Sequence, residues 1–238
     1  ITDFIYGMNS FTGQLISNFI LAIDIFFLLP GFVVAYNETA RAARRPFEYA
    51  TSWLWALKFY FQRWITLTPC YMMIVGFYAT CFYFIGNGPI WNEYAMEMRK
   101  ATREDWWYHA LYIANVGYTS KALPQMWYLT LLMQMYILAP AFLYTLIVIG
   151  PERTLTQVVY GVAFFLSIAS AFGLTYNRQI PAVNNIFRVP EVIEDQLGTE
   201  INNLYICEGL YVRIGSFLLG MLLGYYLKRV NKKPEWYT

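Results

Sequence analysis

The sequence predicts an all-α integral membrane protein, a polytopic transmembrane helical bundle of about five spans with two further helices lying in the membrane interface. Of its 238 residues, 58% are hydrophobic, 20% are aromatic and 13% are charged, whereas a soluble domain carries about 25% charged residues. Five segments are apolar over nearly the 20 residues that crossing a hydrocarbon core of roughly 30 Å requires. Two other segments mix aromatic and charged side chains, which is typical of interfacial helices.

The predicted spans lie within one domain that extends over residues 1–238. They cover residues 15–36, 64–85, 127–149, 158–175 and 212–227. The predicted interfacial helices cover residues 50–62 and 106–116, and the connections 86–126 and 176–210 are predicted as long outer loops. Lys58, Arg63 and His109 stand in or beside the interfacial helices, where long or amphipathic side chains reach the headgroup region.

Positive charges near the span ends predict the orientation. They are Arg41, Arg44 and Arg45 after the first span, Arg153 before the fourth, and Lys228, Arg229, Lys232 and Lys233 after the fifth. If the five spans alternate, all of these charges fall on one side, and the positive-inside rule makes that side cytoplasmic. The N-terminus of the chain is then outside and its C-terminus cytoplasmic. The sequon Asn37-Glu38-Thr39 falls on the predicted inside and is expected to be unglycosylated.

An acidic residue, Asp24, interrupts the apolar run LAIDIFFLLPGFVVAY. A carboxylate at the membrane centre costs roughly 2.5 to 3.5 kcal/mol, so such groups face the bundle interior, a wet cavity or a partner. The other reading is that Asp24 lies nearer the outer interface and only caps or pairs locally. Arg213 in the last predicted span lies at about the same predicted depth. We therefore hypothesise that Asp24 and Arg213 form an ion pair.

Small residues and a proline define the remaining features of the first and last spans. Pro30 removes a backbone donor and, with Gly31, predicts a kink in the first span. Ser216, Gly220 and Gly224 recur every four residues. This spacing places small side chains on one stripe, which indicates that another helix approaches closely.

Several function classes are excluded by composition and motifs. The net charge of +2 does not indicate a nucleic-acid partner, and the sequence contains no metal-binding, phosphate-binding or hydrolase motif. The single histidine, His109, has no Ser, Cys or Asp at the spacing of a triad and is interpreted as an interfacial side chain. The three cysteines, Cys70, Cys81 and Cys207, are interpreted as small buried hydrophobic residues. The tryptophans near span ends are interpreted as an anchoring belt: Trp53, Trp55, Trp64, Trp106, Trp107 and Trp127.

An ordered set of segments resembles one family of animal multipass proteins. The segments are DIFFLLPGF (24–32), RWITLTPCY (63–71), GNGPIW (86–91), WWYHALYI (106–113), MWYLTLLMQMYILAP (126–140) and YVRIGSFLLGMLLGY (211–225). In this set the chain resembles the nose resistant to fluoxetine proteins, a branch of the acyltransferase-3 superfamily of integral membrane acyltransferases. The resemblance covers nearly the whole chain, and the ordered set is more specific than any one motif.

The resemblance implies an activity and a set of site residues. The intact protein would be a bundle of about ten spans that transfers an acyl group, other than an amino-acyl group, from a donor such as acyl-CoA to an unknown acceptor, without a bound cofactor or metal. The presumed catalytic histidine of the family lies on a preceding span, so the chain is read as a fragment whose partners include its N-terminal spans and the lipid bilayer of the plasma membrane or endoplasmic reticulum. The candidate catalytic residues are Asp24, Arg63 and Arg213, and the candidate substrate-binding residues are Gln134, Tyr128 and Tyr211.

The sequence also departs from the family pattern. Pro30 replaces a serine, Thr66 an arginine and Leu132 an aspartate of the family motifs, and the outer-loop cysteines are absent. These departures leave open a non-catalytic protein for lipid or small-molecule uptake or transport on the same fold. They also leave open a degenerate paralogue, because the small-residue stripe of the last span lacks an assured partner within the chain.

Overall fold

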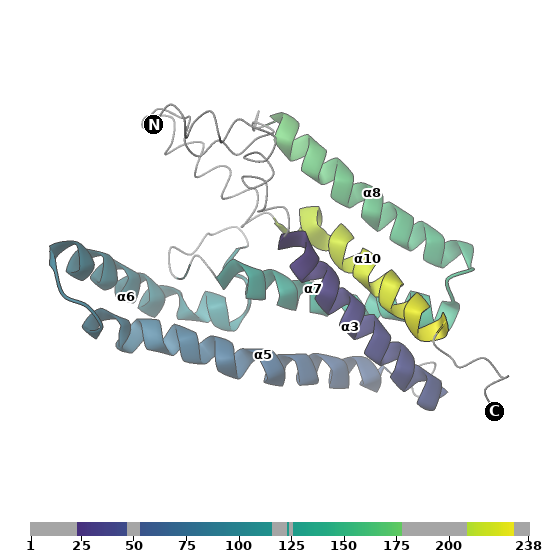
Figure 1. Cartoon of the computed structure of the whole chain (residues 1–238), viewed down its shortest axis with the longest axis horizontal. Helices are drawn as coiled ribbons and strands as arrows, with labels where there is room; N and C mark the ends of the chain where they lie inside the picture. The colour runs from purple at the N-terminus through teal and green to yellow at the C-terminus, as the bar shows by residue number, and fades with distance from the viewer. Residues whose placement is uncertain (1–22, 47–52, 116–122, 124–125, 178–208, 231–238) are drawn as a thin grey trace, which may run out of the picture. The chain divides into compact units, whose positions relative to one another are not determined.

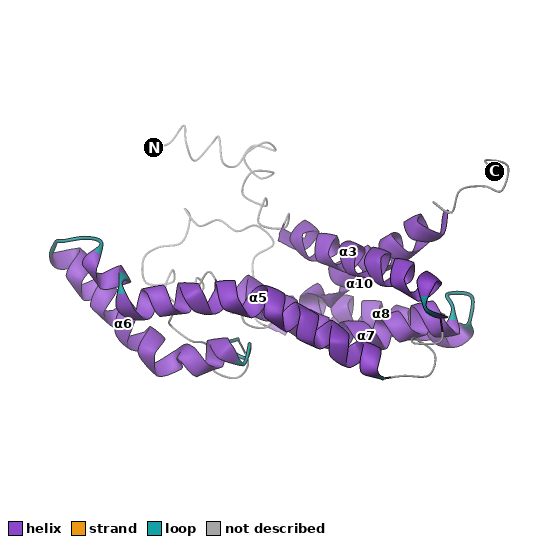
Figure 2. Ribbon diagram, turned by 90° about the horizontal axis from the view of Figure 1, so that it is seen from below, coloured by secondary structure: helices purple, strands orange, loops and turns teal. Residues whose placement is uncertain are grey.

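The computed structural model describes residues 23–46, 53–115, 123, 126–177 and 209–230 (Figure 1). Within these ranges Figure 2 shows helices and connecting loops and no strand, which confirms the predicted all-α class. The chain divides into two compact units, the first formed by residues 1–46, 142–205 and 211–238 and the second by residues 47–141 and 206–210.

Each unit contains three long helices. The first unit holds α3 (Ile23–Arg44), α8 (Thr154–Asn177) and nearly all of α10 (Gly209–Val230), and the second holds α5 (Leu54–Thr80), α6 (Pro89–Ala110) and most of α7 (Trp127–Tyr144). Shorter elements follow α5 and α7, namely η2 (Phe82–Phe84) and the π-helical turn η4 (Thr145–Ile149).

Three helices of the described part of the chain are long and apolar enough to cross a membrane: Trp127–Ile149, Thr154–Leu174 and Gly209–Val230. They coincide with the third, fourth and fifth predicted spans, the third with its predicted bounds. The first predicted span is described only from Ile23, and its helix runs beyond residue 36 to Arg44. The second predicted span forms part of α5, which is long enough but is not among the three.

The predicted break between an interfacial helix at 50–62 and a span at 64–85 is wrong, because α5 is one continuous helix of 27 residues. Neither glycine nor proline occurs between Leu54 and Thr68, so no residue in this stretch breaks the backbone hydrogen bonding. The helix ends at Thr80, where the Nε atoms of Arg99 and Arg103 donate to the carbonyl oxygen of Ala79 at 3.3 and 3.0 Å. These side chains satisfy a terminal carbonyl and place positive charge at the C-terminal end of the helix dipole.

Helix α6 occupies much of the segment predicted as an outer loop, and the predicted helix at 106–116 overlaps only its last residues. Gly88, with φ +135°, adopts a backbone conformation that L side chains rarely take, and Pro89 follows at the first helical position. The buried face of α6 repeats every three or four residues: Ala95, Met98, Thr102, Asp105 and His109. Because α6 is charged on its other face, its composition resembles that of a loop while its periodicity is that of a one-sided helix.

Helices α3 and α10 pack in parallel at very short range in the first unit. A β-carbon at Gly220 would collide with the carbonyl oxygen of Leu28, and one at Gly224 with that of Phe32. In the other direction, a β-carbon at Gly31 would collide with the carbonyl oxygen of Phe217. The predicted function of the small-residue stripe as a packing surface is therefore confirmed, and the idea that it lacks a partner within the chain is wrong. The helix continues through Pro30, and Gly31 serves this contact.

Helix α8 runs antiparallel to α10. Ser170 contacts the backbone of Tyr211, while Ser167, one turn earlier in α8, contacts Val212 and Gly215 farther along α10. Helix α3 runs parallel to α10, so the relative directions of these three helices are those that alternating first, fourth and fifth spans would have. The ends of α3 and α10 and the beginning of α8 consequently lie at the same end of the first unit (Figure 1).

Two predictions about burial are wrong. Cys70 and Cys81 are free and exposed instead of buried. Cys70 lies on the side of α5 that faces away from α6 and α7, and Cys81 lies just beyond the end of α5. Trp55 is 8% exposed and packs inside the second unit instead of joining the predicted belt. Trp53, Trp64 and the pair at 106–107 are exposed, as an anchoring belt requires. Cys207 lies outside the described residues.

Candidate functional site

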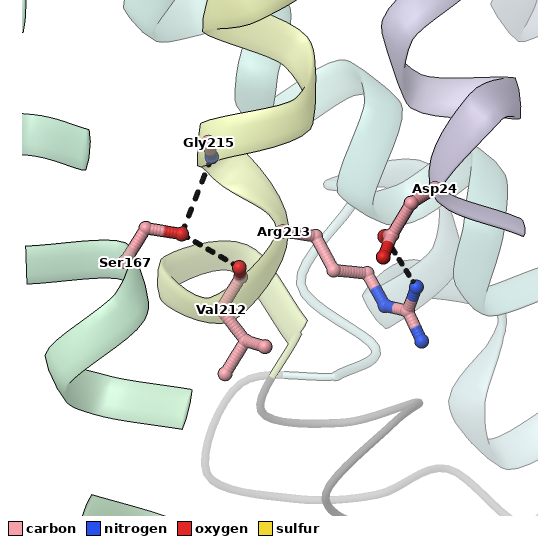
Figure 3. A network of polar contacts seen from close by, with 5 residues as sticks. All are labelled: Asp24, Ser167, Val212, Arg213 and Gly215. Carbon is pink, nitrogen blue, oxygen red and sulfur yellow. Dashed lines mark hydrogen bonds and ion pairs between the residues drawn. The ribbon is translucent and has the colours of Figure 1, made fainter. Parts of the chain in front are cut away.

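The hypothesised pairing of Asp24 and Arg213 is confirmed. Nη1 of Arg213 donates to Oδ1 of Asp24 at 2.7 Å, between the beginning of α10 and the beginning of the described part of α3 (Figure 3). The Arg213 side chain is 3% exposed, whereas that of Asp24 is 41% exposed. The guanidinium also lies 5.9 Å from the centre of the Phe27 ring, a cation–π distance. Arg213 is thus a buried cation whose charge is balanced by a carboxylate that other groups can still reach.

Ser167 of α8 fixes the backbone on both sides of Arg213. Its hydroxyl donates to the carbonyl oxygen of Val212 at 2.7 Å and accepts from the amide of Gly215 at 3.3 Å (Figure 3). A β-carbon at Gly215 would lie 3.0 Å from the Ser167 hydroxyl oxygen, so the close contact uses the missing side chain. Three helices therefore determine where the guanidinium stands: α10 carries it, α8 holds its backbone, and α3 supplies its counter-charge.

Tyr211, a candidate substrate-binding residue, lies beside this cluster. It is half-exposed, and its carbonyl oxygen accepts from the hydroxyl of Ser170 at 3.1 Å. The structure thus brings Tyr211, Arg213 and Asp24 into one neighbourhood of the first unit. Chemically, a carboxylate held by a buried arginine can orient a base or accept a hydrogen bond from a hydroxyl group.

The candidates Arg63, Tyr128 and Gln134 belong to the second unit. The guanidinium of Arg63 lies 5.2 Å from the ring centre of Phe59 and 5.1 Å from that of Tyr136. A guanidinium held over two aromatic rings keeps its N–H groups for other acceptors. Tyr128, at the start of α7, is half-buried and packs edge-on against Trp127.

Gln134 ties the turn after α6 to α7. Its Nε2 donates to the carbonyl oxygen of Tyr112 at 2.9 Å and to Oδ1 of Asn115 at 2.7 Å, and its Oε1 lies 3.5 Å from Nδ2 of Asn115. The turn needs such support because Tyr112 has φ +56°, which is uncommon for a residue other than glycine. The amide of Gln134 is therefore engaged in holding the backbone, in addition to any contact with substrate.

A buried polar cluster of the second unit was missed in the sequence. The Tyr71 hydroxyl of α5 lies 2.7 Å from Nδ1 of His109 on α6 and 3.3 Å from Oγ1 of Thr130 on α7, and all three side chains are at most 1% exposed. His109 is consequently not the predicted interfacial side chain. The three- and four-residue spacing of the buried face of α6, which ends at His109, was the signal for its burial.

A second pair extends the cluster. The hydroxyl groups of Thr68 and Tyr112 lie 3.1 Å apart, and the rings of Tyr112 and Tyr71 stack with their centres 5.2 Å apart. Burial raises the pKa of the Tyr112 phenol above its ordinary value, so this group remains a neutral hydrogen-bond donor. Polar groups from α5, α6 and α7 thus satisfy one another inside the second unit.

Replacement of Tyr71 by Phe is expected to destabilise the second unit by about 1 to 3 kcal/mol, because His109 and Thr130 lose a buried hydrogen-bond partner. The measurement is thermal unfolding of the full-length protein in detergent. Tyr94→Phe is the control, since Tyr94 lies on the exposed face of α6. Equal unfolding temperatures for the two variants would show that the buried hydroxyl contributes nothing to stability.

In the described part of the chain, no three His, Cys, Asp or Glu side chains gather as a metal site would require. The candidate residues described above are joined by an ion pair and by hydrogen bonds. The best-defined element of the candidate site is the Asp24–Arg213 pair.

The chain is similar to known proteins over most of its length. The model of the acyltransferase-3 family, described as an acyltransferase domain, matches residues 2–238. The chain is 29% identical over 245 residues to "Nose resistant to fluoxetine protein 6" of Caenorhabditis elegans, with 95% of this chain and 28% of that protein covered. It is 27% identical over 227 residues to "Regulator of hypoxia-inducible factor 1" of the same organism, covering 90% and 41%.

The chain thus spans less than half the length of either relative. No solved structure matches it significantly. The family model nevertheless covers almost every residue, and the apolar helices are those of a membrane protein. The chain belongs to the acyltransferase-3 family.

Proposed function

We propose that the protein is an integral membrane acyltransferase that moves an acyl group from acyl-CoA to a hydroxyl group of an acceptor. The observation that carries this proposal is the family match over residues 2–238. Within that match the chain keeps a buried arginine paired with a half-exposed carboxylate, which is a costly arrangement in a membrane helix and one that usually marks a functional site.

In this proposal Asp24 is a positioning residue. One of its carboxylate oxygens is held by Arg213, and the side chain remains 41% exposed. It therefore has capacity to orient a catalytic base supplied by another part of the intact protein, as carboxylates orient histidines in many sites. The base would take the proton of the acceptor hydroxyl while the hydroxyl oxygen attacks the thioester carbonyl and the CoA thiolate leaves.

Arg63 is proposed to bind the anionic donor or the oxyanion that forms during transfer. Its side chain is half-buried and stands over the rings of Phe59 and Tyr136, which hold the guanidinium without using its N–H donors. A fixed cation of this kind stabilises developing negative charge at little reorganisation cost. Gln134, Tyr128 and Tyr211 stay candidates for substrate contacts.

The test is acyl transfer by the full-length protein in isolated membranes, measured with labelled acyl-CoA. Arg63→Ala is expected to lower transfer roughly 100-fold, the effect of removing one stabilising donor of an oxyanion, while the protein remains at the membrane. Lys100→Ala, which removes an exposed cation of α6, is the matched control and should transfer normally. Equal rates of acyl transfer by the two variants would contradict the proposal, and so would the absence of acyl transfer by the unaltered protein.

A second candidate is a non-catalytic protein for lipid or small-molecule uptake on the same fold. It is favoured by Thr66, which stands where the family has an arginine and whose hydroxyl donates to the Gln62 carbonyl oxygen of its own helix at 2.7 Å. That position therefore supplies no charge to a donor site. Uptake of labelled lipid that persists in Arg63→Ala, with no acyl transfer in any form of the protein, is the result this candidate predicts.

A further inference from the structure

Six cations gather at one end of the first unit. They are Arg41, Arg44, Arg45, Arg153, Lys228 and Arg229. All but Lys228 are exposed, and Lys228 is half-buried. We call this set the basic end. It is assembled from three separate parts of the chain, so its charge density is a property of the fold.

The helix directions explain why these residues meet. Asp24 faces Arg213 at one end of the parallel helices, and Tyr36 faces Lys228 near the other, so the last turns of α3 and α10 lie together. In the antiparallel helix α8, Phe164 lies beside Gly215. Ten residues earlier α8 begins, about 15 Å back along its axis. Its preceding residue, Arg153, is thus carried toward the ends of the other two helices.

Aromatic side chains hold two of the cations in place. The ammonium nitrogen of Lys228 lies 4.7 Å from the ring centre of Tyr36. Nη1 of Arg229 donates to the Tyr225 hydroxyl at 3.1 Å, and its guanidinium lies 5.8 Å from the ring centre of that tyrosine. Tyrosine is enriched where a membrane helix enters the headgroup region. Cations held against tyrosines at the end of an apolar helix are typical of the membrane surface.

Two acidic residues lie near the basic end in the described part of the chain. They are Glu38 and Glu152. Glu38 is 2% exposed, and its Oε1 atom forms an ion pair with Nη1 of Arg41 at 2.8 Å within α3. Glu152 is exposed beside Arg153. In the described part of the basic end, six cations thus stand against two acidic residues.

We propose that the basic end is a binding surface for anionic phospholipid headgroups. Helices α8 and α10 are apolar enough to cross the membrane, so cations at their ends meet the headgroup layer. Phosphates and carboxylates of lipids such as phosphatidylserine are the negative groups found in that layer, and arginine and lysine bind them through charge-assisted hydrogen bonds. The bound lipids link the ends of three helices and retain the first unit in the leaflet that is rich in anionic lipid. The proposal does not depend on acyl transfer.

The test uses the full-length protein purified in a neutral detergent. Native mass spectrometry with added phosphatidylserine and phosphatidylcholine gives the ratio of the two affinities. Lys228→Gln with Arg229→Gln is expected to lower that ratio about fivefold for each cation removed. The control is Lys100→Gln, which removes an exposed cation of α6 and should leave the ratio unchanged.

A charge-preserving variant separates lipid binding from a folding defect. Lys228→Arg with Arg229→Lys keeps both charges and should keep the preference for phosphatidylserine, and added salt should weaken this preference in the unaltered protein. An unchanged ratio in the variant that carries both Gln substitutions would overturn the proposal, and so would an equal loss per cation in Lys100→Gln.

Discussion

Alanine at Gly220 or Gly224 is expected to separate α10 from α3 and to destabilise the first unit by about 3 kcal/mol, the upper end of what overpacking costs. A β-carbon at either position would collide with a carbonyl oxygen of α3, at Leu28 or Phe32. The obstructing atoms are backbone atoms inside a helix, so they cannot rotate away as a side chain can. The measurement is the unfolding temperature of the full-length protein in detergent.

The controls for this prediction are glycines of α8. A β-carbon at Gly161 or Gly173 would meet nothing within 4 Å, and alanine is a better helix former than glycine. Gly161→Ala and Gly173→Ala should leave stability unchanged or raise it slightly. If all four variants unfolded at the same temperature, the close parallel packing of α3 and α10 would be contradicted.

Loss of Asp24 is expected to be more harmful than loss of Arg213. Asp24→Ala removes the carboxylate that pairs with the guanidinium of Arg213, 3% exposed, and breaking a buried ion pair in this way costs about 3 to 5 kcal/mol. In Arg213→Met the carboxylate of Asp24 is 41% exposed and can be solvated, and the methionine still fills the buried position beside Phe27. The unfolding temperature should therefore fall much further for Asp24→Ala.

The reversed pair tests the same interaction from the other side. Asp24→Arg combined with Arg213→Asp restores opposite charges, so the double variant should be more stable than either single reversal. Asp24→Ala that unfolds at the same temperature as Arg213→Met, together with a double reversal that recovers nothing, would contradict a structural ion pair.

The sequence predicted well those features in which a single residue would cost much free energy without a partner. A carboxylate and a guanidinium in apolar segments each require a partner, so Asp24 and Arg213 could be matched across 189 positions of chain. The four-residue spacing of Ser216, Gly220 and Gly224 likewise marks a close helix contact wherever it occurs. What sequence alone left open was which helix makes that contact, because the spacing carries no information about the partner.

The features it missed depend on tertiary packing. Helix α6 carries many charges, so hydropathy assigned it to a loop, although its buried face ends at His109. His109 was judged to have no orienting group because Tyr71, whose hydroxyl contacts it, lies 38 positions earlier in the chain, and Thr130 lies 59 positions after Tyr71. The hydroxyl group that orients His109 comes from α5, and no local sequence pattern predicts that α5 packs against α6 at this point. The prediction divided the continuous helix α5 into an interfacial helix and a span. It did so because Lys58 and Arg63 suggest a membrane interface when the helices that pack against α5 are unknown.

The most direct test of the account is acyl transfer by the full-length protein that carries both reversals, Asp24→Arg and Arg213→Asp. The reversal preserves an ion pair but moves the carboxylate away from the half-exposed position on α3. We predict a folded membrane protein that no longer transfers labelled acyl groups from acyl-CoA, because in the proposed mechanism Asp24 positions the base as well as balancing Arg213. Transfer at the rate of the unaltered protein would contradict that claim and leave the pair with a structural role alone.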